Sequence, residues 1–164
     1  MDQTEDRDMS ILIPGCGNAH EAAYILSLGF KKVTLMDISA VLVEALKIKF
    51  EKEVASGQCE LIHGDFFELK GTFDLVLEQT FFCAINPSLR SSYVKKMSEI
   101  IAPKGKMAGL LFEMDKPQGP PFGGNRDEYT SLFEKYFTIR TMENCYNSIS
   151  SRSGKELFVI FEIK

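Results

Sequence analysis

The stretch ILIPGCGNAHEAAYILSLG, Ile11 to Gly29, decides the fold. An apolar run ends at Pro14, Gly15 and Gly17 flank a cysteine, and a helical pattern follows. A strand, a glycine turn and a helix in this order form the first unit of an open α/β sheet, in which the helix N-terminus lies at the turn and favours polar or anionic ligands. We therefore expect a doubly wound sheet with a ligand site at this turn.

The rest of the chain repeats the alternation of strands and helices. Five short runs rich in Val, Ile, Leu and Phe are typical of buried parallel strands. These runs are residues 10–14, 32–38, 59–65, 73–79 and 106–112. Two final β runs, 137–145 and 155–164, are expected to form an antiparallel hairpin at the edge of the sheet.

Helix start signals separate the expected strands. Asn18 with Glu21 has the spacing of a capping box, and Ser39 precedes a helical pattern over residues 40–54. A third helix is expected to begin at Asn86 and Pro87 and to end before residue 103, where a proline forbids its continuation. A Pro- and Gly-rich loop over residues 113–127 and a short helix around 128–136 follow.

Composition sets the class of protein. The 164 residues, 45% of them hydrophobic, predict one domain over residues 1–164. The net charge of −4 and the mixed signs along the chain leave no basic stripe, so nucleic acid is not an expected partner. The first ten residues are polar and acidic, without the basic and apolar regions typical of a signal peptide, and no apolar run approaches ~20 residues. We therefore expect a soluble, cytoplasmic protein that does not bind membranes.

Cysteine and histidine patterns argue against a metal site. The four cysteines are far apart and form no C-x-x-C pair, and the two histidines have no second cluster of ligands. A reducing compartment fits such cysteines best. Cys83 has no histidine near it in sequence, so a buried structural thiol is expected there rather than a nucleophile.

Candidate ligand residues follow from the strand ends, where doubly wound sheets bind their ligands. Gly15 and Gly17 let a ligand approach the backbone, but a dinucleotide fingerprint needs a third glycine where His20 stands, which disfavours NAD and FAD. Asp37 ends the second strand and can accept hydrogen bonds from both ribose hydroxyls. The alternative is that Asp37 only places a charge at the helix start capped by Ser39.

The third and fourth strands end in further candidates. Asp65 can accept from an adenine amine, and Phe66 or Phe67 can lie against the purine or serve only as core. Glu78 and Gln79 can receive a cofactor amino group, orient a substrate, or be a simple polar pair at a strand end. A nucleoside without a phosphate tail, such as S-adenosylmethionine, fits this set.

Several motifs resemble a known family. IPGCGNAHEA, Asp37 and GDFF resemble the cofactor site of class I S-adenosylmethionine-dependent methyltransferases. LEQTFFCAINP and GPPFGG resemble the thiopurine S-methyltransferase superfamily, especially its thiol and halide methyltransferase branch. The resemblance runs from Ile11 to the C-terminus and implies a Rossmann-like methyltransferase fold, with a mostly parallel seven-stranded sheet and an antiparallel last strand.

The resemblance also implies site residues. The implied cofactor contacts are Gly15, Cys16, Gly17, Asp37, Ile38, Asp65, Phe66 and Glu78. The implied substrate contacts are Gln79, Phe81, Phe82 and Phe122. No catalytic base is assigned, because an activated sulfonium methyl needs mainly alignment and exclusion of water.

The expected activity is methyl transfer from S-adenosylmethionine to a thiol, thiopurine or halide, with S-adenosylhomocysteine as product. The alternative is a non-catalytic domain that binds the same nucleosides, and a nicotinamide oxidoreductase or a methyltransferase acting on protein or nucleic acid are further rivals. Members of the family usually carry an N-terminal segment, commonly with tryptophans, that folds over the cofactor. The first expected strand here begins at Ser10 and the chain has no Trp, so we expect this lid to be absent or supplied differently. The acceptor and the oligomeric state are left open.

Overall fold

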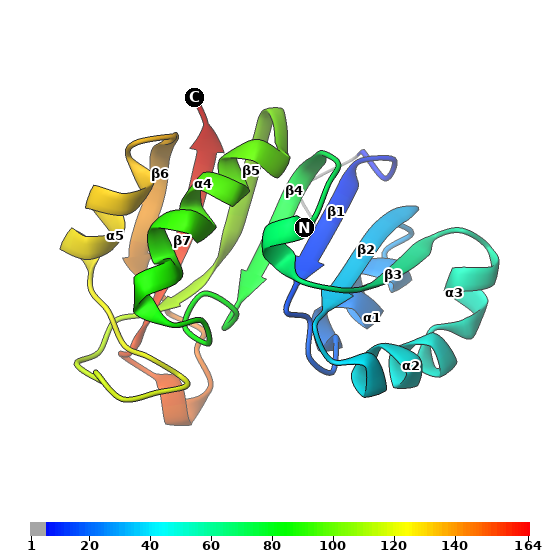
Figure 1. Ribbon diagram of the computed structural model, residues 1–164, viewed down its shortest axis with the longest axis horizontal. Helices are drawn as coiled ribbons and strands as arrows, with labels where there is room; N and C mark the ends of the chain where they lie inside the picture. Colours follow the sequence, from blue (N-terminus) through cyan, green and yellow to red (C-terminus); the bar gives the residue numbers. More distant parts are fainter. Residues whose placement is uncertain (1–5) are drawn as a thin grey trace.

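The computed structural model describes residues 6–164 and has at its centre a seven-stranded sheet (Figure 1). The strands lie in the order β3-β2-β1-β4-β5-β7-β6. They are β1 (Ser10–Pro14), β2 (Lys32–Asp37), β3 (Cys59–His63), β4 (Phe73–Gln79), β5 (Ile101–Phe112), β6 (Phe137–Asn144) and β7 (Glu156–Ile163). Strands β1 to β5 pair in parallel, and β7 is antiparallel to both β5 and β6. The predicted α/β fold with its antiparallel last strand is confirmed.

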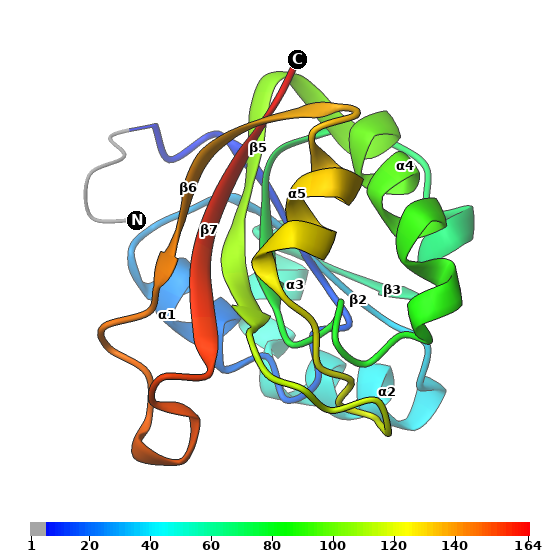
Figure 2. The same ribbon diagram turned by 90° about the vertical axis from the view of Figure 1, so that its left-hand side faces the viewer.

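Helices cover both faces of the sheet. The helices are α1 (His20–Ser27), α2 (Ala40–Lys49), α3 (Glu51–Ala55), α4 (Arg90–Ile100) and α5 (Arg126–Phe133), with 3-10 turns η1 (Phe66–Glu68), η2 (Pro87–Leu89) and η3 (Ser150–Arg152). Figure 2 shows α4 and α5 on one side of the sheet and α1 on the other. The core is correspondingly divided, since Tyr93 and Phe133 pack in one buried cluster and Ile25 and Leu46 in a second.

The first helix begins differently from the prediction. The expected capping box of Asn18 and Glu21 does not form, because the N-cap is Ala19, which has a left-handed backbone (φ +49°) and no side-chain cap. The turn is closed by backbone bonds instead: the Ala19 N–H donates to the Cys16 carbonyl over 2.8 Å. The glycine turn thus leads directly into the helix without a side-chain signal.

The other helix starts agree more closely. Ser39 caps α2 by accepting a hydrogen bond from the Leu42 N–H, as predicted. The predicted helix over 40–54 is interrupted at Phe50, whose side chain is buried in the core at the junction of α2 and α3. Asn86 caps the 3-10 turn η2, so α4 begins only at Arg90, three residues after Pro87.

Two boundaries in the second half also shift. The fifth strand was expected at 106–112 but begins at Ile101, because it continues directly from α4 and resumes pairing with β4 past an irregularity. The short helix begins at Arg126, since the Asn125 side chain accepts from the Glu128 N–H over 2.9 Å and caps it.

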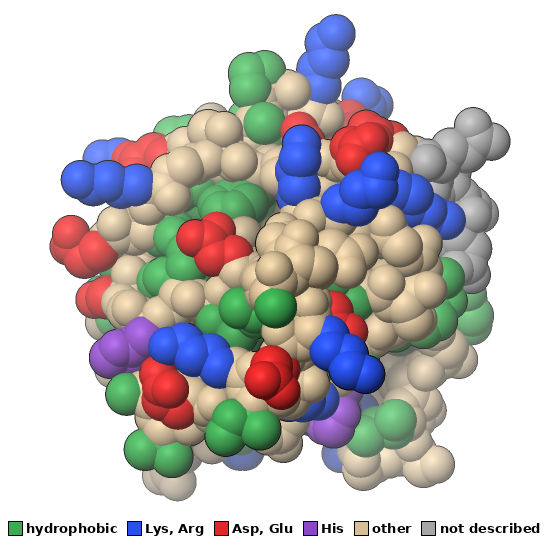
Figure 3. All heavy atoms as spheres, turned by 90° about the vertical axis from the view of Figure 1, so that its right-hand side faces the viewer, with side chains coloured by type: hydrophobic (Ala, Val, Ile, Leu, Met, Phe, Trp, Pro, Cys, Tyr) green, Lys and Arg blue, Asp and Glu red, His purple; other side chains and the backbone are tan. Residues whose placement is uncertain are grey.

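Surface charge shows the mixture expected from the sequence. Figure 3 views the side of α2 and α3, where positive and negative side chains are interspersed with hydrophobic ones. The exposed hydrophobic residues of this region include Ile38, Val41 and Ile48. Within residues 6–164, no helix has the length and apolar character needed to cross a membrane.

Candidate functional site

A cavity of about 450 Å³ opens at the carboxyl ends of β1 to β4. Its lining comes from four successive strand ends, as the rule for open α/β sheets predicts. The lining residues are Gly15, Met36, Asp37, Ile38, Gly64, Asp65, Phe66, Phe67, Thr80, Phe81, Ala84 and Ile85. The structure therefore brings together five of the residues expected to contact a cofactor, and Phe81 from the expected substrate set.

The glycine turn is shaped by backbone conformation and by close packing. Gly15 and Gly17 both have positive φ, +56° and +52°, which L side chains adopt only at a cost. A Cβ atom at Gly15 would lie 2.3 Å from Cδ2 of Phe81, whereas a Cβ at Gly17 would meet nothing within 4 Å. The Phe81 ring therefore occupies the space that a side chain at residue 15 would need, while Gly15 itself lines the cavity.

Asp37 joins the first two strand ends. Its Oδ2 accepts from the Gly17 N–H over 3.2 Å, and its Oδ1 accepts from the Ser39 N–H over 3.0 Å. The second bond agrees with the reading of Asp37 as part of the helix start. Each carboxylate oxygen has a further lone pair, so Asp37 can still accept hydrogen bonds from a ligand in the cavity.

Asp65 and Phe66 form the third wall. The Asp65 Oδ1 accepts from the Phe67 N–H over 2.9 Å and caps η1. Phe66 is 5% exposed and stacks on Tyr93, with ring centres 5.3 Å apart. Phe66 thus belongs to the core and also lines the cavity, while its contact with a purine stays a prediction. Ile38 also lines the cavity, but unlike Phe66 its side chain is 74% exposed.

Glu78 is buried and is not among the residues that line the cavity. Its Oε1 accepts from the backbone N–H groups of Phe81 (2.8 Å) and Phe82 (3.0 Å). Its Oε2 accepts from the Tyr93 hydroxyl. Burial raises the pKa of Glu78 to about 7, and the three hydrogen bonds act in the opposite direction. The structure shows Glu78 holding the turn that carries Phe81.

The remaining predicted residues lie outside the lining of the cavity. Cys16, between the two glycines of the turn, is buried, and burial together with the nearby Asp37 raises the pKa of its thiol to about 12. Phe82 is 1% exposed and packs against Tyr93 and Tyr129 in the core. Gln79 is exposed at the end of β4.

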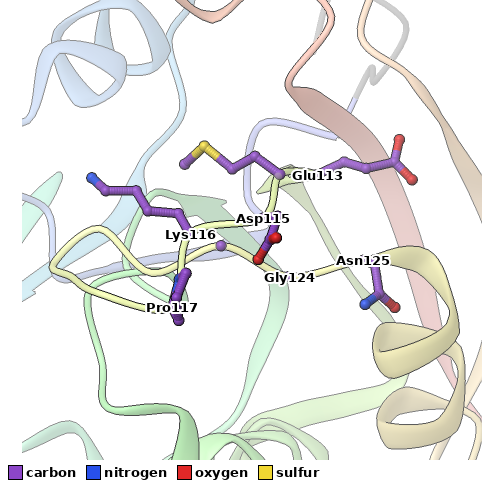
Figure 4. A pocket seen from close by; sticks show the side chains of 8 residues that line it. Glu113, Asp115, Lys116, Pro117, Gly124 and Asn125 are labelled. Atoms are coloured by element: carbon purple, nitrogen blue, oxygen red, sulfur yellow. The ribbon is translucent and has the colours of Figure 1, made fainter.

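The loop over residues 113–125 docks beside this region. The Phe122 N–H donates to the Cys83 carbonyl over 2.7 Å, which joins the predicted substrate residue to the segment after β4. The loop folds back on itself, because Met114 and Gly124 pair as an antiparallel bridge. A second cavity of about 380 Å³ lies within the loop (Figure 4), where Lys116 and Glu113 point in opposite directions.

Two polar residues of α4 were missed by the sequence reasoning. Tyr93 supplies the hydrogen bond to Glu78, and Arg90 is 3% exposed. The signal was the spacing of residues 90, 93, 97 and 100, which places the arginine on the apolar face of the helix. In the part of the chain that the structure describes, no group of three or more His, Cys, Asp or Glu side chains is placed to hold a metal ion.

Sequence comparison identifies the family. Residues 1–162 match the thiopurine S-methyltransferase (TPMT) family. The chain belongs to this family. It is 32% identical over 124 residues to a probable thiol methyltransferase 2 of Arabidopsis thaliana, an alignment that covers 74% of this chain and 54% of that protein. It is 29% identical over 150 residues to thiocyanate methyltransferase 1 of Brassica oleracea, which covers 88% of this chain and 66% of that protein. The chain thus spans between about half and two thirds of the length of these two relatives.

Structural comparison agrees on the fold. The glycopeptide N-methyltransferase MtfA, solved in complex with S-adenosyl-L-homocysteine, superposes with a TM-score of 0.79 at 13% identity. The match covers 99% of this chain and 86% of MtfA. The TPMT-family chain therefore has the Rossmann-like methyltransferase fold.

Proposed function

We propose that this chain is an S-adenosylmethionine-dependent methyltransferase domain that methylates a small soft nucleophile such as a thiol, a thiopurine or a halide. The observation that carries the proposal is the cavity that unites Gly15, Asp37, Ile38, Asp65 and Phe66 at the strand ends of a TPMT-family fold. The names of the curated relatives, a thiol and a thiocyanate methyltransferase, support a sulfur nucleophile.

The residues at the cavity fit the cofactor. Its volume lies within the range of about 300–1,000 Å³ that is common for small-molecule sites. Asp37 would accept from the ribose hydroxyls, Asp65 from the adenine amine, and Ile38 and Phe66 would contact the purine. When bound, S-adenosylmethionine supplies a methyl group already activated on a sulfonium sulfur.

The chain's own contribution to catalysis is alignment and exclusion of water. The side chains on the β4 side of the cavity are uncharged: Thr80, Phe81, Ala84 and Ile85. A weakly hydrated nucleophile enters such a surface at lower cost than a strongly hydrated one, because less water must be removed from it. The Phe81 ring can also stabilise a neighbouring cation through its face. We assign no general base.

The test is calorimetric titration of the purified chain with S-adenosylhomocysteine, with NADH as a control ligand. We expect micromolar binding of S-adenosylhomocysteine, no binding of NADH, and loss of binding in Asp37→Ala. Asp127→Ala, an exposed carboxylate on α5, is the matched control and should bind normally. An absence of binding in folded wild-type protein contradicts the proposal. Binding without turnover of thiols or iodide would instead support a non-catalytic binding domain.

A further inference from the structure

Arg90, the first residue of α4, is a buried arginine outside the cavity lining. It is 3% exposed, and charged side chains are almost never buried to this extent without partners. The proposed methyl transfer assigns it no role. Its position at the start of a helix gives no electrostatic reason for a cation, because the helix dipole favours negative charge there.

Three separate segments converge on the guanidinium of Arg90. Nη1 donates to Glu128 Oε1 on α5 over 2.7 Å, and Nη2 donates to the Gly123 carbonyl of the 113–125 loop over 2.7 Å. The guanidinium carbon lies 4.9 Å from the centre of the Phe82 ring, in the segment after β4. The side chain therefore connects α4 to the loop, to α5 and to the turn that Glu78 holds.

The backbone of the 113–125 loop packs closely against its neighbours at the residues next to the Arg90 contact. A Cβ atom at Gly123 would lie 2.0 Å from the Met114 carbonyl oxygen, and one at Gly124 would lie 2.2 Å from the Tyr129 hydroxyl. The two glycines thus let the loop backbone pass between neighbours that leave no room for a side chain. The adjacent Phe122 N–H reaches the Cys83 carbonyl. The Arg90 bond to Gly123 is therefore one residue from the bond that docks the loop.

We propose that Arg90 is a positioning residue, whose guanidinium holds the 113–125 loop against the segment after β4 and so sets the acceptor side of the site. This inference rests on the proposed function and on the family resemblance, which implies Phe81 and Phe122 as acceptor contacts. Arginine suits the task because its planar fork serves two acceptors in fixed directions. Lysine retains the charge but offers no such fork, so Arg90→Lys removes the geometry and keeps the cation.

The first test is amide hydrogen exchange of the full chain, read residue by residue. The reporters are the hydrogen-bonded amides of Met114, Phe122, Gly123 and Gly124. In Arg90→Lys we expect these amides to exchange about ten-fold faster, the effect of losing roughly one charge-assisted hydrogen bond. The amides between β1 and β2 should be unchanged. Arg140→Lys, an exposed arginine paired with Glu162, is the control and should alter none of the reporters.

A second variant keeps the test decisive if Arg90→Lys does not fold. Glu128→Gln retains an acceptor oxygen but removes the negative charge beside the guanidinium. We expect the same loop amides to exchange faster, by a smaller factor than in Arg90→Lys. Unchanged loop exchange in the variants that fold would overturn the proposal. So would an equal acceleration of the loop and of the β1–β2 amides, since this shows a general loss of stability.

A kinetic measurement separates positioning from structure. In Arg90→Lys the KM for a thiol acceptor should rise about ten-fold, while the Kd of S-adenosylhomocysteine changes less than about two-fold. A parallel rise in both constants contradicts a role on the acceptor side. The exchange experiment needs neither the acceptor nor S-adenosylhomocysteine. A wild-type chain that binds no S-adenosylhomocysteine therefore contradicts the proposed function, whereas the exchange of the loop amides still tests whether Arg90 holds the 113–125 loop.

Discussion

The ring of Phe81 packs directly against Gly15, with Cδ2 of the ring 2.3 Å and Cγ 2.6 Å from the place where a Cβ of residue 15 would be. The contact joins the end of β4 to the turn after β1, and Glu78 fixes it from below through the Phe81 N–H. Gly15 and Phe81 both line the cavity. The shape of the proposed cofactor site therefore depends on Gly15, because the Phe81 ring leaves no room for a side chain at that position.

Gly15→Ala should damage both stability and ligand binding. The added methyl group collides with the ring, and the positive φ of +56° strains any L residue. We expect a loss of about 2–4 kcal/mol in the free energy of unfolding and at least a ten-fold weaker affinity for S-adenosylhomocysteine, measured by urea unfolding and calorimetry. Gly17→Ala has nearly the same strain without the collision, so it should cost only about 1–2 kcal/mol. Equal costs for the two variants would show that the Phe81 contact does not matter.

Glu78 should make the stability of the folded chain fall as pH rises. Burial raises the pKa of its carboxyl to about 7 in the folded state, from an ordinary value of 4.5. Between these values the unfolded chain has released the proton and the folded chain keeps it, so increasing pH favours unfolding until both states are ionised. The shift corresponds to roughly 3 kcal/mol across the whole window.

The measurement is urea unfolding of wild type and Glu78→Gln at intervals from pH 5 to pH 8. Wild type should lose stability relative to Glu78→Gln as the pH rises, and the difference should level off above pH 7. The pKa of Asp74 is lowered by its hydrogen bonds with Ser10, so its contribution changes below this range. Parallel stability curves for the two proteins would contradict the raised pKa of Glu78.

The sequence predicts which residues lie at the strand ends better than it predicts the buried contacts that those residues make. Gly15, Asp37 and Asp65 could be identified because parallel strands end at one edge of the sheet, so short-range patterns place them together. The contacts of Glu78 could not, because they depend on Tyr93, which reaches it from another element. A sequence pattern marks a polar residue at a strand end but does not say on which side of the backbone its partners stand.

The same limit explains the error at the first helix start and the missed arginine. Asn18 has the residue type and spacing of a cap, yet the left-handed backbone at Gly17 and Ala19 makes Ala19 the N-cap. Arg90 occurs on an apolar helix face, but its partners Gly123 and Glu128 lie more than thirty residues away. Long-range polar pairs of this kind are specified by tertiary packing, which local patterns do not encode.

Three buried thiols should be unreactive in the folded chain. Burial raises the pKa of Cys16 and Cys83 to about 12 and that of Cys59 to about 11. At pH 8 the thiolate populations, and therefore the rates of alkylation, should be about a thousand-fold lower for the first two than for an ordinary thiol. Peptide mapping after timed iodoacetamide treatment, with urea-unfolded chain as the reference, measures each rate. Rapid labelling of Cys83 in folded protein would instead reveal an activated thiol.

Gly109 of β5 should be the glycine at which an added methyl group does most harm to the sheet. Its register partner is Glu78 of β4, and a Cβ at Gly109 would lie 2.0 Å from the Glu78 carbonyl oxygen. The obstacle is strand backbone, which cannot rotate away as a side chain can. We expect Gly109→Ala to cost about 3 kcal/mol or more in urea unfolding, because the pairing of β4 and β5 must open to accept the methyl group. Gly64→Ala is the matched control: its Cβ would make only an ordinary 3.7 Å contact with the Met36 side chain, so the reduced freedom of the unfolded chain should leave it neutral or slightly stabilised. If the two substitutions cost the same, the close approach of β5 to Glu78 is not a determinant of stability.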